Sequence, residues 1–266
     1  MDVHTRHNIN VAGAEDGPTI LLVHGFGCDQ NLWRHVVDEL KSDFRLVLID
    51  LIGSGSADPA AWDTAKYSSL GGYAADILEI VDVLDLKDVV FVGHSVSAMI
   101  GVLATIRDPG RFAKLVLLTP SPCYIDHDGY RGGFSRADID ELLQSLEQNY
   151  LGWSKGMAPV IMGTPDRPEL QDELTATFCR TDPECARVFA RTTFLSDNRA
   201  DLPRISLPTL VVECAQDAIA PREVGTYVHA HIPGSKKVTL NAVGHCPHVS
   251  APAATAAAIA AFARPA

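Results

Sequence analysis

The 266-residue sequence lacks a continuous apolar run of the roughly 20 residues that a helix needs to cross a bilayer. The longest stretch that is poor in charge, 251–263, is rich in alanine and predicts an amphipathic helix that closes the fold. The first residues show no apolar segment behind a basic end, so a secretory signal is not visible. We therefore expect a cytoplasmic protein with no membrane association.

Positive charge is also scarce, with 22 Lys and Arg against 33 Asp and Glu and a formal net charge of −11. Such a surface repels the phosphate backbone of nucleic acids and anionic lipid headgroups. The 20 Gly and 16 Pro are too few for a low-complexity chain, and 47% hydrophobic with 21% charged residues is typical of a globular protein. The composition excludes disordered, collagen-like and coiled-coil chains, and nucleic acid is not an expected partner.

Signs of disulfides, metals and nucleotides are weak. The six cysteines are scattered along a chain that does not look exported, so we expect free thiols. The segment 245–248, His-Cys-Pro-His, suggests zinc ligands, but its proline prevents helical spacing and no second ligand pair stands out. The glycines at 25–30 and 53–56 fit neither a dinucleotide fingerprint nor a phosphate loop. The sequence therefore implies no metal and no cofactor.

Short runs of Val, Ile and Leu recur along the chain and are continuous rather than alternating, which is typical of strands covered on both faces. They occupy 19–23, 45–49, 89–92, 114–118 and 209–212. Apolar residues at helical spacing lie between them, at 33–40 and 77–84. Weaker strands at 6–11 and 237–240 are expected at the sheet edges. This pattern predicts an α/β fold with a mostly parallel sheet flanked by helices.

Consecutive helices are predicted between about 121 and 199, where the alternation of strands and helices stops. Ser135 with Asp138 three residues later predicts one helix start, and Asp182 followed by Pro183 predicts another. An apolar stripe runs through Leu142, Leu143, Leu146 and Tyr150.

A helical insertion in such a sheet is most simply a cap over the carboxyl ends of the strands, where open α/β sheets bind ligands. No internal repeat or linker composition marks the insertion as a separately folding unit. We expect one domain, with a core of about 1–122 and 200–266 and a helical cap of about 123–199.

The most informative segment, 91–98, leads from a strand through Gly-His-Ser directly into a helix. A serine in such a tight turn is a nucleophile elbow, in which the strained backbone holds the hydroxyl clear and the residues two before and two after must be small. Gly93 and Ser97 fill these places, although glycine is usual at the second. We interpret Ser95 as a nucleophile; the alternative is a buried turn serine without activity.

A serine nucleophile needs a base to take its proton and a carboxylate to orient that base. Asp217 lies a few residues past the run at 209–212, and His245 follows the last weak strand. The chain order Ser, Asp, His is the order of the α/β-hydrolase fold. Asp50 precedes the nucleophile and Glu213 falls inside the apolar segment rather than beyond it, so Asp217 is favoured as the orienting acid.

Two other histidines compete with His245 for the role of base. His94 adjoins the nucleophile, but its ring is expected to point away from the serine. His248 is the stronger rival. Gly244 favours a turn that presents His245 at the strand end, whereas a proline stiffens the chain before His248. We therefore predict His245 as the general base.

Attack on a carbonyl creates an oxyanion, which needs preorganised N–H donors. One donor is the backbone N–H of Val96, directly after the nucleophile. The other is expected from the glycine-rich loop 24–27, and we assign it to the N–H of Phe26, whose side chain would then face the pocket. The alternative is a plain glycine turn.

Six segments of the sequence together match the motifs of a known family. They are 25–30 with Trp33, 93–101, 120–124, 132–134, 194–199 and 244–248. Together they resemble one branch of the α/β hydrolases, formed by the bacterial stress regulator RsbQ and the plant strigolactone and karrikin receptors. The similarity runs across nearly the whole chain and is more specific than a lone Gly-x-Ser-x-Gly match, because it includes the cap and the loop after the base.

This resemblance implies a four-helix, V-shaped cap over an apolar pocket and a working triad on Ser95, Asp217 and His245. It places the substrate-binding side chains at Phe26, Phe134, Trp153 and Phe194. From the residues alone, the last two fit a cap core equally well. The resemblance also implies slow hydrolysis of small hydrophobic esters or lactones. In the plant members the substrate is a butenolide signal, and RsbQ works with a PAS-domain phosphatase.

We interpret the sequence as a serine hydrolase of the carboxylesterase or lactonase type, which cleaves small hydrophobic esters or butenolide-like lactones through an acyl-enzyme on Ser95. The alternative is an RsbQ-like signalling receptor that binds or slowly hydrolyses a small ligand and acts on a phosphatase-type protein partner. A dehalogenase is disfavoured, because such enzymes place a carboxylate where this chain has Ser95.

Overall fold

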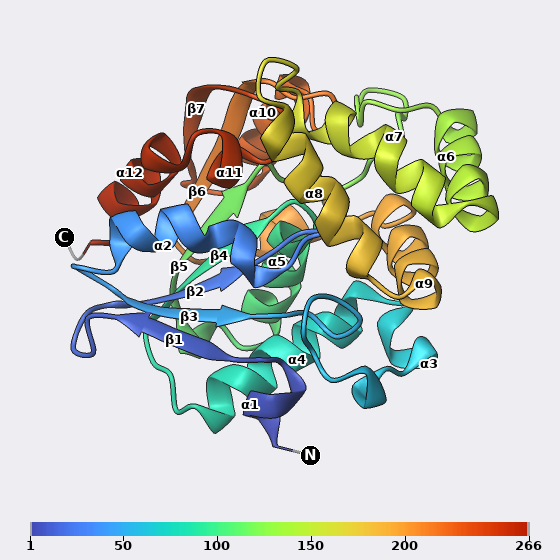
Figure 1. Ribbon diagram of the computed structural model, residues 1–266. Helices are drawn as coiled ribbons and strands as arrows, with labels where there is room; N and C mark the ends of the chain where they lie inside the picture. The colour runs from blue at the N-terminus through green and yellow to red at the C-terminus, as the bar shows by residue number, and fades with distance from the viewer. Residues whose placement is uncertain (1, 265–266) are drawn as a thin grey trace.

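A seven-stranded sheet organises residues 2–264, the part of the chain that the computed structural model describes (Figure 1). The strands are β1 (Asn10–Gly13), β2 (Thr19–Val23), β3 (Arg45–Ile49), β4 (Val89–His94), β5 (Phe112–Leu118), β6 (Thr209–Gln216) and β7 (Lys236–Val243). Their order in the sheet is β1-β3-β2-β4-β5-β6-β7. Strand β1 pairs antiparallel with β3, and every other pairing is parallel. The prediction of a mostly parallel sheet is confirmed.

All five apolar runs are strands, and the runs at 19–23 and 45–49 have the bounds of β2 and β3. The weak strand at 237–240 lies within β7 at one edge. The weak strand at 6–11 is correct in its place at the other sheet edge but wrong in its bounds, because only residues 10 and 11 belong to β1 and helix α1 (Val3–Arg6) occupies its start. The Asp2 side chain caps this helix by accepting a hydrogen bond from the Thr5 N–H, and Asn8 has φ of 46°, which interrupts an extended chain.

Helices cover both faces of the sheet, which explains why the strand sequences are continuously apolar. Leu21 and Val23 of β2 pack in one buried cluster with α4 (Leu70–Val83) and α5 (Val96–Arg107). Ile20 and Leu22 point to the opposite face and pack with α2 (Arg34–Leu40) and α12 (Pro252–Ala263). Successive side chains of a strand therefore serve two separate cores.

The remaining short elements connect these layers. They are η1 (Gln30–Trp33), η2 (Pro59–Ala61), α3 (Thr64–Tyr67), η3 (Pro109–Arg111), η4 (Arg199–Arg204) and α11 (Pro247–Ser250). Helix α10 (Arg222–His231) packs on the sheet, and its Val228 belongs to the same buried cluster as α4 and α5. The helix predicted at 33–40 is α2, preceded by a 3₁₀ turn, and the closing helix is α12. None of the helices within residues 2–264 is long and apolar enough to cross a membrane. The six cysteines are free thiols.

Four consecutive helices separate β5 from β6. They are α6 (Arg136–Gln148), α7 (Tyr150–Met162), α8 (Pro168–Arg180) and α9 (Pro183–Phe194). Figure 1 shows them together at the end of the sheet toward which β2 and β3 point. We call these four helices the cap. The boundaries of the cap segment at 123 and 199 remain a prediction.

Two cap helices begin where the capping residues in the sequence predicted. Ser135 and Asp138 form a reciprocal capping box at α6, and Asp182 accepts hydrogen bonds from the first N–H groups of α9. The prediction of one apolar stripe from Leu142 to Tyr150 was wrong, because α6 ends at Gln148 and Tyr150 begins α7. Asn149 leaves helical geometry with φ of −151° and caps α7 by accepting a hydrogen bond from the Gly152 N–H.

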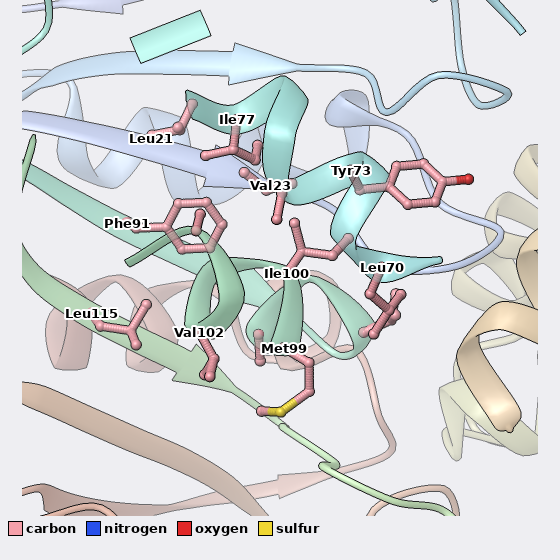
Figure 2. Packing of buried hydrophobic residues seen from close by; sticks show 14 of the residues in the cluster. Leu21, Val23, Leu70, Tyr73, Ile77, Phe91, Met99, Ile100, Val102 and Leu115 are labelled. Carbon is pink, nitrogen blue, oxygen red and sulfur yellow. The ribbon is translucent and has the colours of Figure 1, made fainter. Parts of the chain in front are cut away.

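A substitution at Ile77 tests the packing between α4 and the sheet. It is completely buried in the cluster that Figure 2 shows, together with Leu21 and Ile100. Truncating Ile77 to alanine should lower the free energy of unfolding by about 2–5 kcal/mol, because the close-packed surroundings collapse only partly into the gap. Val83 on the same helix is 56% exposed, so Val83→Ala is the matched control, with an expected change below about 0.5 kcal/mol. Equal losses in urea melts of the two variants would contradict this assignment of the core.

Candidate functional site

Ser95 lies at the sharp turn between β4 and α5, with φ of 57° and ψ of −122°. A positive φ is strained for a residue with a side chain, and such strain is typical of functional sites. The turn also requires a glycine two residues earlier, since a Cβ on Gly93 would lie 2.3 Å from the carbonyl oxygen of Ser97. The structure therefore has the backbone geometry expected of a nucleophile elbow.

Ser97 has a role that its small size did not predict. Its hydroxyl donates a 2.5 Å hydrogen bond to the carbonyl oxygen of His24, at the start of the loop predicted to supply an oxyanion donor. The His24 ring is held too, because its Nε2 accepts from the Leu51 N–H at 3.1 Å and its Nδ1 donates to the Gly25 carbonyl at 2.9 Å. These bonds fix the glycine loop against the elbow.

The structure brings Ser95, His245 and Asp217 together at the carboxyl ends of the strands. His245 Nε2 lies 2.7 Å from Ser95 Oγ, and His245 Nδ1 lies 2.7 Å from Asp217 Oδ2. The side chains of His245 and Asp217 are only 5% and 1% exposed, so little water competes for these hydrogen bonds. With Nδ1 donating to the carboxylate, Nε2 of a neutral imidazole is free to accept the serine proton.

Backbone groups hold the acid in place. The second carboxylate oxygen of Asp217 accepts hydrogen bonds from the N–H groups of Ile219 at 2.8 Å and Ala220 at 3.0 Å. Only the oxygen that faces the imidazole is then left to bind it. This arrangement fixes the orientation of the carboxylate and, through it, the tautomer of His245.

The position of His245 depends on contacts with both the core and the cap. The backbone N–H of His245 donates to the carbonyl oxygen of Ile161 in α7 at 2.8 Å. The carbonyl oxygen of His245 accepts hydrogen bonds from His94 Nε2 and Thr119 Oγ1. Gly244 has φ of 89°, and a Cβ there would lie 1.9 Å from the carbonyl of Met162. A glycine is therefore required where the loop of the base meets the cap.

The rival acids and bases occupy structural positions. Asp50 accepts hydrogen bonds from the N–H groups of Gln30 and Ser56, and Glu213 faces Lys237 at 3.0 Å. His94 orients the His245 backbone rather than the serine hydroxyl. His248 is fully buried against other rings, and burial holds its pKa well below the usual value.

Two backbone N–H groups are available beside Ser95 for an oxyanion. Val96 is the first residue of α5, where a helical N–H has no partner within the helix. The Phe26 N–H donates no hydrogen bond to any group in residues 2–264. Its loop passes close to the elbow, since a Cβ on Gly25 would lie 3.1 Å from Ser95 Cβ.

A largely apolar cavity opens onto Ser95 and His245 beneath the cap. Its apolar walls are Phe26, Tyr124, Trp153, Met157, Ile161, Leu174, Phe194 and Ile219. Three of the four predicted pocket residues therefore line it. Phe134 does not, because it packs behind the wall and pairs through its backbone with Tyr124 and Asp126.

Tyr124 lies beside Ser95 and is one of the cavity residues that the sequence did not reveal. Its hydroxyl lies 3.4 Å from Ser95 Oγ, and burial raises its pKa to about 12. The phenol therefore stays protonated near neutral pH and can donate a hydrogen bond into the cavity. Its position shortly after the carboxyl end of β5 is a signal that could have revealed it, because open α/β sheets bind ligands at that edge.

The segment His-Cys-Pro-His at 245–248 does not gather a zinc site. Both ring nitrogens of His245 are engaged by Ser95 and Asp217. The ring of His248 instead packs against Trp33, with centroids 4.5 Å apart.

The fold and the elbow define the class of protein. Residues 20–258 match the Alpha/beta hydrolase family, and the chain belongs to this family. The strand order, the helices on both faces and the four-helix insertion are the architecture predicted for it.

Within the family, the chain is similar to named esterases and receptors. It is 39% identical to a probable esterase of Oryza sativa subsp. japonica, over 94% of this chain and 93% of the relative. It is 38% identical to the strigolactone esterase of Arabidopsis thaliana, over 92% of each, and 36% identical to "Karrikin insensitive 2 receptor CA" of Petunia hybrida, over 94% and 93%. The resemblance to the strigolactone and karrikin receptor branch is confirmed.

A solved structure is similar over nearly its whole length. It is olei00960, a hydrolase from Oleispira antarctica, with 41% identity, a TM-score of 0.96, and coverage of 98% of this chain and 96% of that chain. The α/β-hydrolase fold is therefore confirmed, and the relatives support a hydrolase of the esterase type.

His248 gives the site a testable pH dependence of stability. In the unfolded chain it binds a proton near pH 6.5, but burial lowers its pKa in the folded protein. Above about pH 6.5, His248 is neutral in both states and does not lower the free energy of unfolding. Below that pH, only the unfolded chain binds the proton, so the free energy of unfolding falls by up to about 1.4 kcal/mol per pH unit. Urea unfolding between about pH 7.5 and 5 should show a smaller slope for His248→Gln than for the wild type.

Part of the slope should remain in this variant, because burial also lowers the pKa of His7. The control is the double variant His7→Gln/His248→Gln, in which the slope should fall further. Identical slopes for the wild type and His248→Gln would contradict a neutral, buried His248.

Proposed function

We propose that the protein is a serine hydrolase that cleaves small hydrophobic esters or lactones. The observation that carries this proposal is the pair of 2.7 Å contacts linking Ser95, His245 and Asp217 at the floor of an apolar cavity. A serine, a base and an orienting carboxylate in this geometry are the parts that acyl transfer requires. The esterase relatives support the same class of reaction.

In the proposed mechanism, Ser95 Oγ attacks the substrate carbonyl while His245 Nε2 takes the hydroxyl proton. Asp217 stabilises the imidazolium that forms. The tetrahedral intermediate collapses as His245 returns the proton to the leaving alcohol oxygen, which leaves an acyl group on Ser95. In a lactone the alcohol remains attached to that acyl chain. Water activated by His245 then releases the acid.

The N–H groups of Phe26 and Val96 stabilise the oxyanion in this mechanism. Both belong to fixed backbone, one in the loop tied by Ser97 to the elbow and the other in the first turn of α5. Preorganised donors of this kind need not reorient as charge develops, and removal of a single side-chain donor from the oxyanion hole of a serine protease costs about 2.7–4 kcal/mol. The positive end of the α5 dipole acts in the same direction.

The cavity favours small hydrophobic substrates. The ring of Phe26 lies 6.1 Å from that of Trp153 and 6.0 Å from that of Phe194, so aromatic faces surround the space above the serine. Thr193 also lines the cavity, and its Oγ1 is buried and has no hydrogen-bond partner within residues 2–264. Together with the Tyr124 hydroxyl, it offers a donor to a second substrate oxygen, which an ester or lactone carries.

A signalling role is the second candidate, because the relatives include proteins named as receptors. A ligand in the cavity would contact the triad and the cap together, since α7 both lines the cavity and binds the backbone of His245. The partner predicted from the resemblance is a PAS-domain phosphatase. This role predicts turnover that stalls after one cycle and a thermal stability that depends on ligand.

Ser95→Ala is the direct test of the proposed hydrolase. The variant should fold normally, because only an oxygen atom is removed, and should lose at least about 10³-fold in kcat/KM for a small aryl acetate. Ser145 is exposed on α6, so Ser145→Ala is the matched control and should retain wild-type turnover. Initial rates from release of the phenol measure both variants. Undiminished turnover in Ser95→Ala would remove the serine from the mechanism.

A further inference from the structure

A second cluster of chemically reactive side chains lies away from the triad. The thiol of Cys123, the ring of His127 and the carboxylate of Asp197 each offer one ligand atom, and these atoms lie within 4.8 Å of one another. Cys123 is buried, whereas the other two residues are exposed to solvent. The proposed hydrolase uses none of the three side chains.

The spacing of two of the three ligand atoms matches that of a zinc site. Cys123 Sγ lies 3.6 Å from His127 Nε2. Tetrahedral zinc binds sulfur at about 2.3 Å and imidazole nitrogen at about 2.0–2.1 Å, which places the two ligand atoms about 3.5 Å apart. We propose that Cys123, His127 and Asp197 form a binding site for a divalent transition metal of the zinc type, with water as the fourth ligand.

The loop that carries two of these ligands is held in shape by its own hydrogen bonds. His127 and Tyr130 exchange backbone hydrogen bonds of 2.9 Å in both directions, and the Tyr130 hydroxyl donates to the Cys123 carbonyl at 2.5 Å. Asp126 accepts from the Gly132 N–H at 2.7 Å. Because the loop is already ordered in this way, metal binding does not have to bring the thiol and the imidazole together.

The third ligand comes from the other end of the cap. Cys123 and Asp197 pair in an isolated antiparallel bridge, and the Asn198 N–H donates to the Pro122 carbonyl at 2.7 Å. The segment that leaves β5 for the cap thus runs beside the segment that returns from α9. A metal ion bound here would link the two connections between the cap and the sheet.

The charges of the site suit a divalent ion. A thiolate and a carboxylate neutralise two positive charges, and the thiol proton leaves to solvent when the metal binds. Arg199 donates to Asp197 Oδ1 at 2.8 Å and Oδ2 at 2.6 Å and lies over the Tyr130 ring. A carboxylate accepts about four hydrogen bonds, so a lone pair remains for the metal, and ligand carboxylates are commonly held by such an outer partner.

The proposed metal ligands are close in sequence to residues that line the cavity. Tyr124, whose hydroxyl faces Ser95, directly follows Cys123, and Phe194 of the cavity wall lies three residues before Asp197. A bound ion would therefore hold the ends of two wall segments together. We expect one equivalent of metal to raise the melting temperature of the protein by reinforcing the attachment of the cap.

Cobalt titration of the reduced protein tests the site independently of any hydrolase activity. Tetrahedral cobalt bound by a thiolate gives a near-ultraviolet charge-transfer band together with visible bands, and zinc should displace both at one equivalent. His127→Ala should weaken cobalt binding at least about tenfold, and the variant should fold because His127 is exposed. Cys123→Ser should abolish the charge-transfer band. His35 is also exposed, so His35→Ala is the control and should bind cobalt as the wild type does.

Absence of a charge-transfer band in the wild type, or its persistence in Cys123→Ser, would overturn the proposal. A band that instead disappears in Cys28→Ser would also overturn it, because the metal would then lie at the Cys28 and Cys246 thiols of the cavity wall. Circular dichroism of each variant establishes that it is folded before titration.

Discussion

The hydrogen bond between Ser95 Oγ and His245 Nε2 is the interaction on which the rest of the site depends. The two residues are 150 positions apart, and their side chains meet only because β4 and β7 end at the same edge of a parallel sheet. The strained elbow at Ser95 raises the hydroxyl above that edge, and Asp217, beyond the neighbouring β6, fixes the ring. A small rotation of any of these three loops would open the contact.

The cap takes part in the same arrangement rather than merely covering it. Its helix α7 accepts the His245 N–H at Ile161, while Gly244 allows the loop of the base to approach the end of that helix closely. A movement of α7 therefore changes both the cavity wall and the position of the base. Through this contact, the proposed hydrolysis and the proposed ligand sensing would share one structural basis.

Much of this arrangement could be predicted from the sequence, because its signals are local. Continuous apolar runs marked the strands, and the residues around Ser95 marked the elbow. The role of Ser97 as a donor to the glycine loop could not be predicted, since its acceptor lies 73 positions away. Phe134 was wrongly placed in the cavity and Tyr124 was missed for the same reason: which of them faces the cavity depends on how the loop between β5 and α6 folds back on itself.

The most direct test of the account is a stopped-flow time course with an aryl acetate and a fluorogenic butenolide, combined with peptide mass mapping of acid-quenched samples. The proposed acyl-enzyme mechanism predicts a burst, sustained turnover afterwards, and an acyl group carried by the peptide that contains Ser95. Turnover without an acyl group on that peptide would contradict the covalent mechanism. A burst that stalls after one cycle would contradict a hydrolase role and favour a receptor.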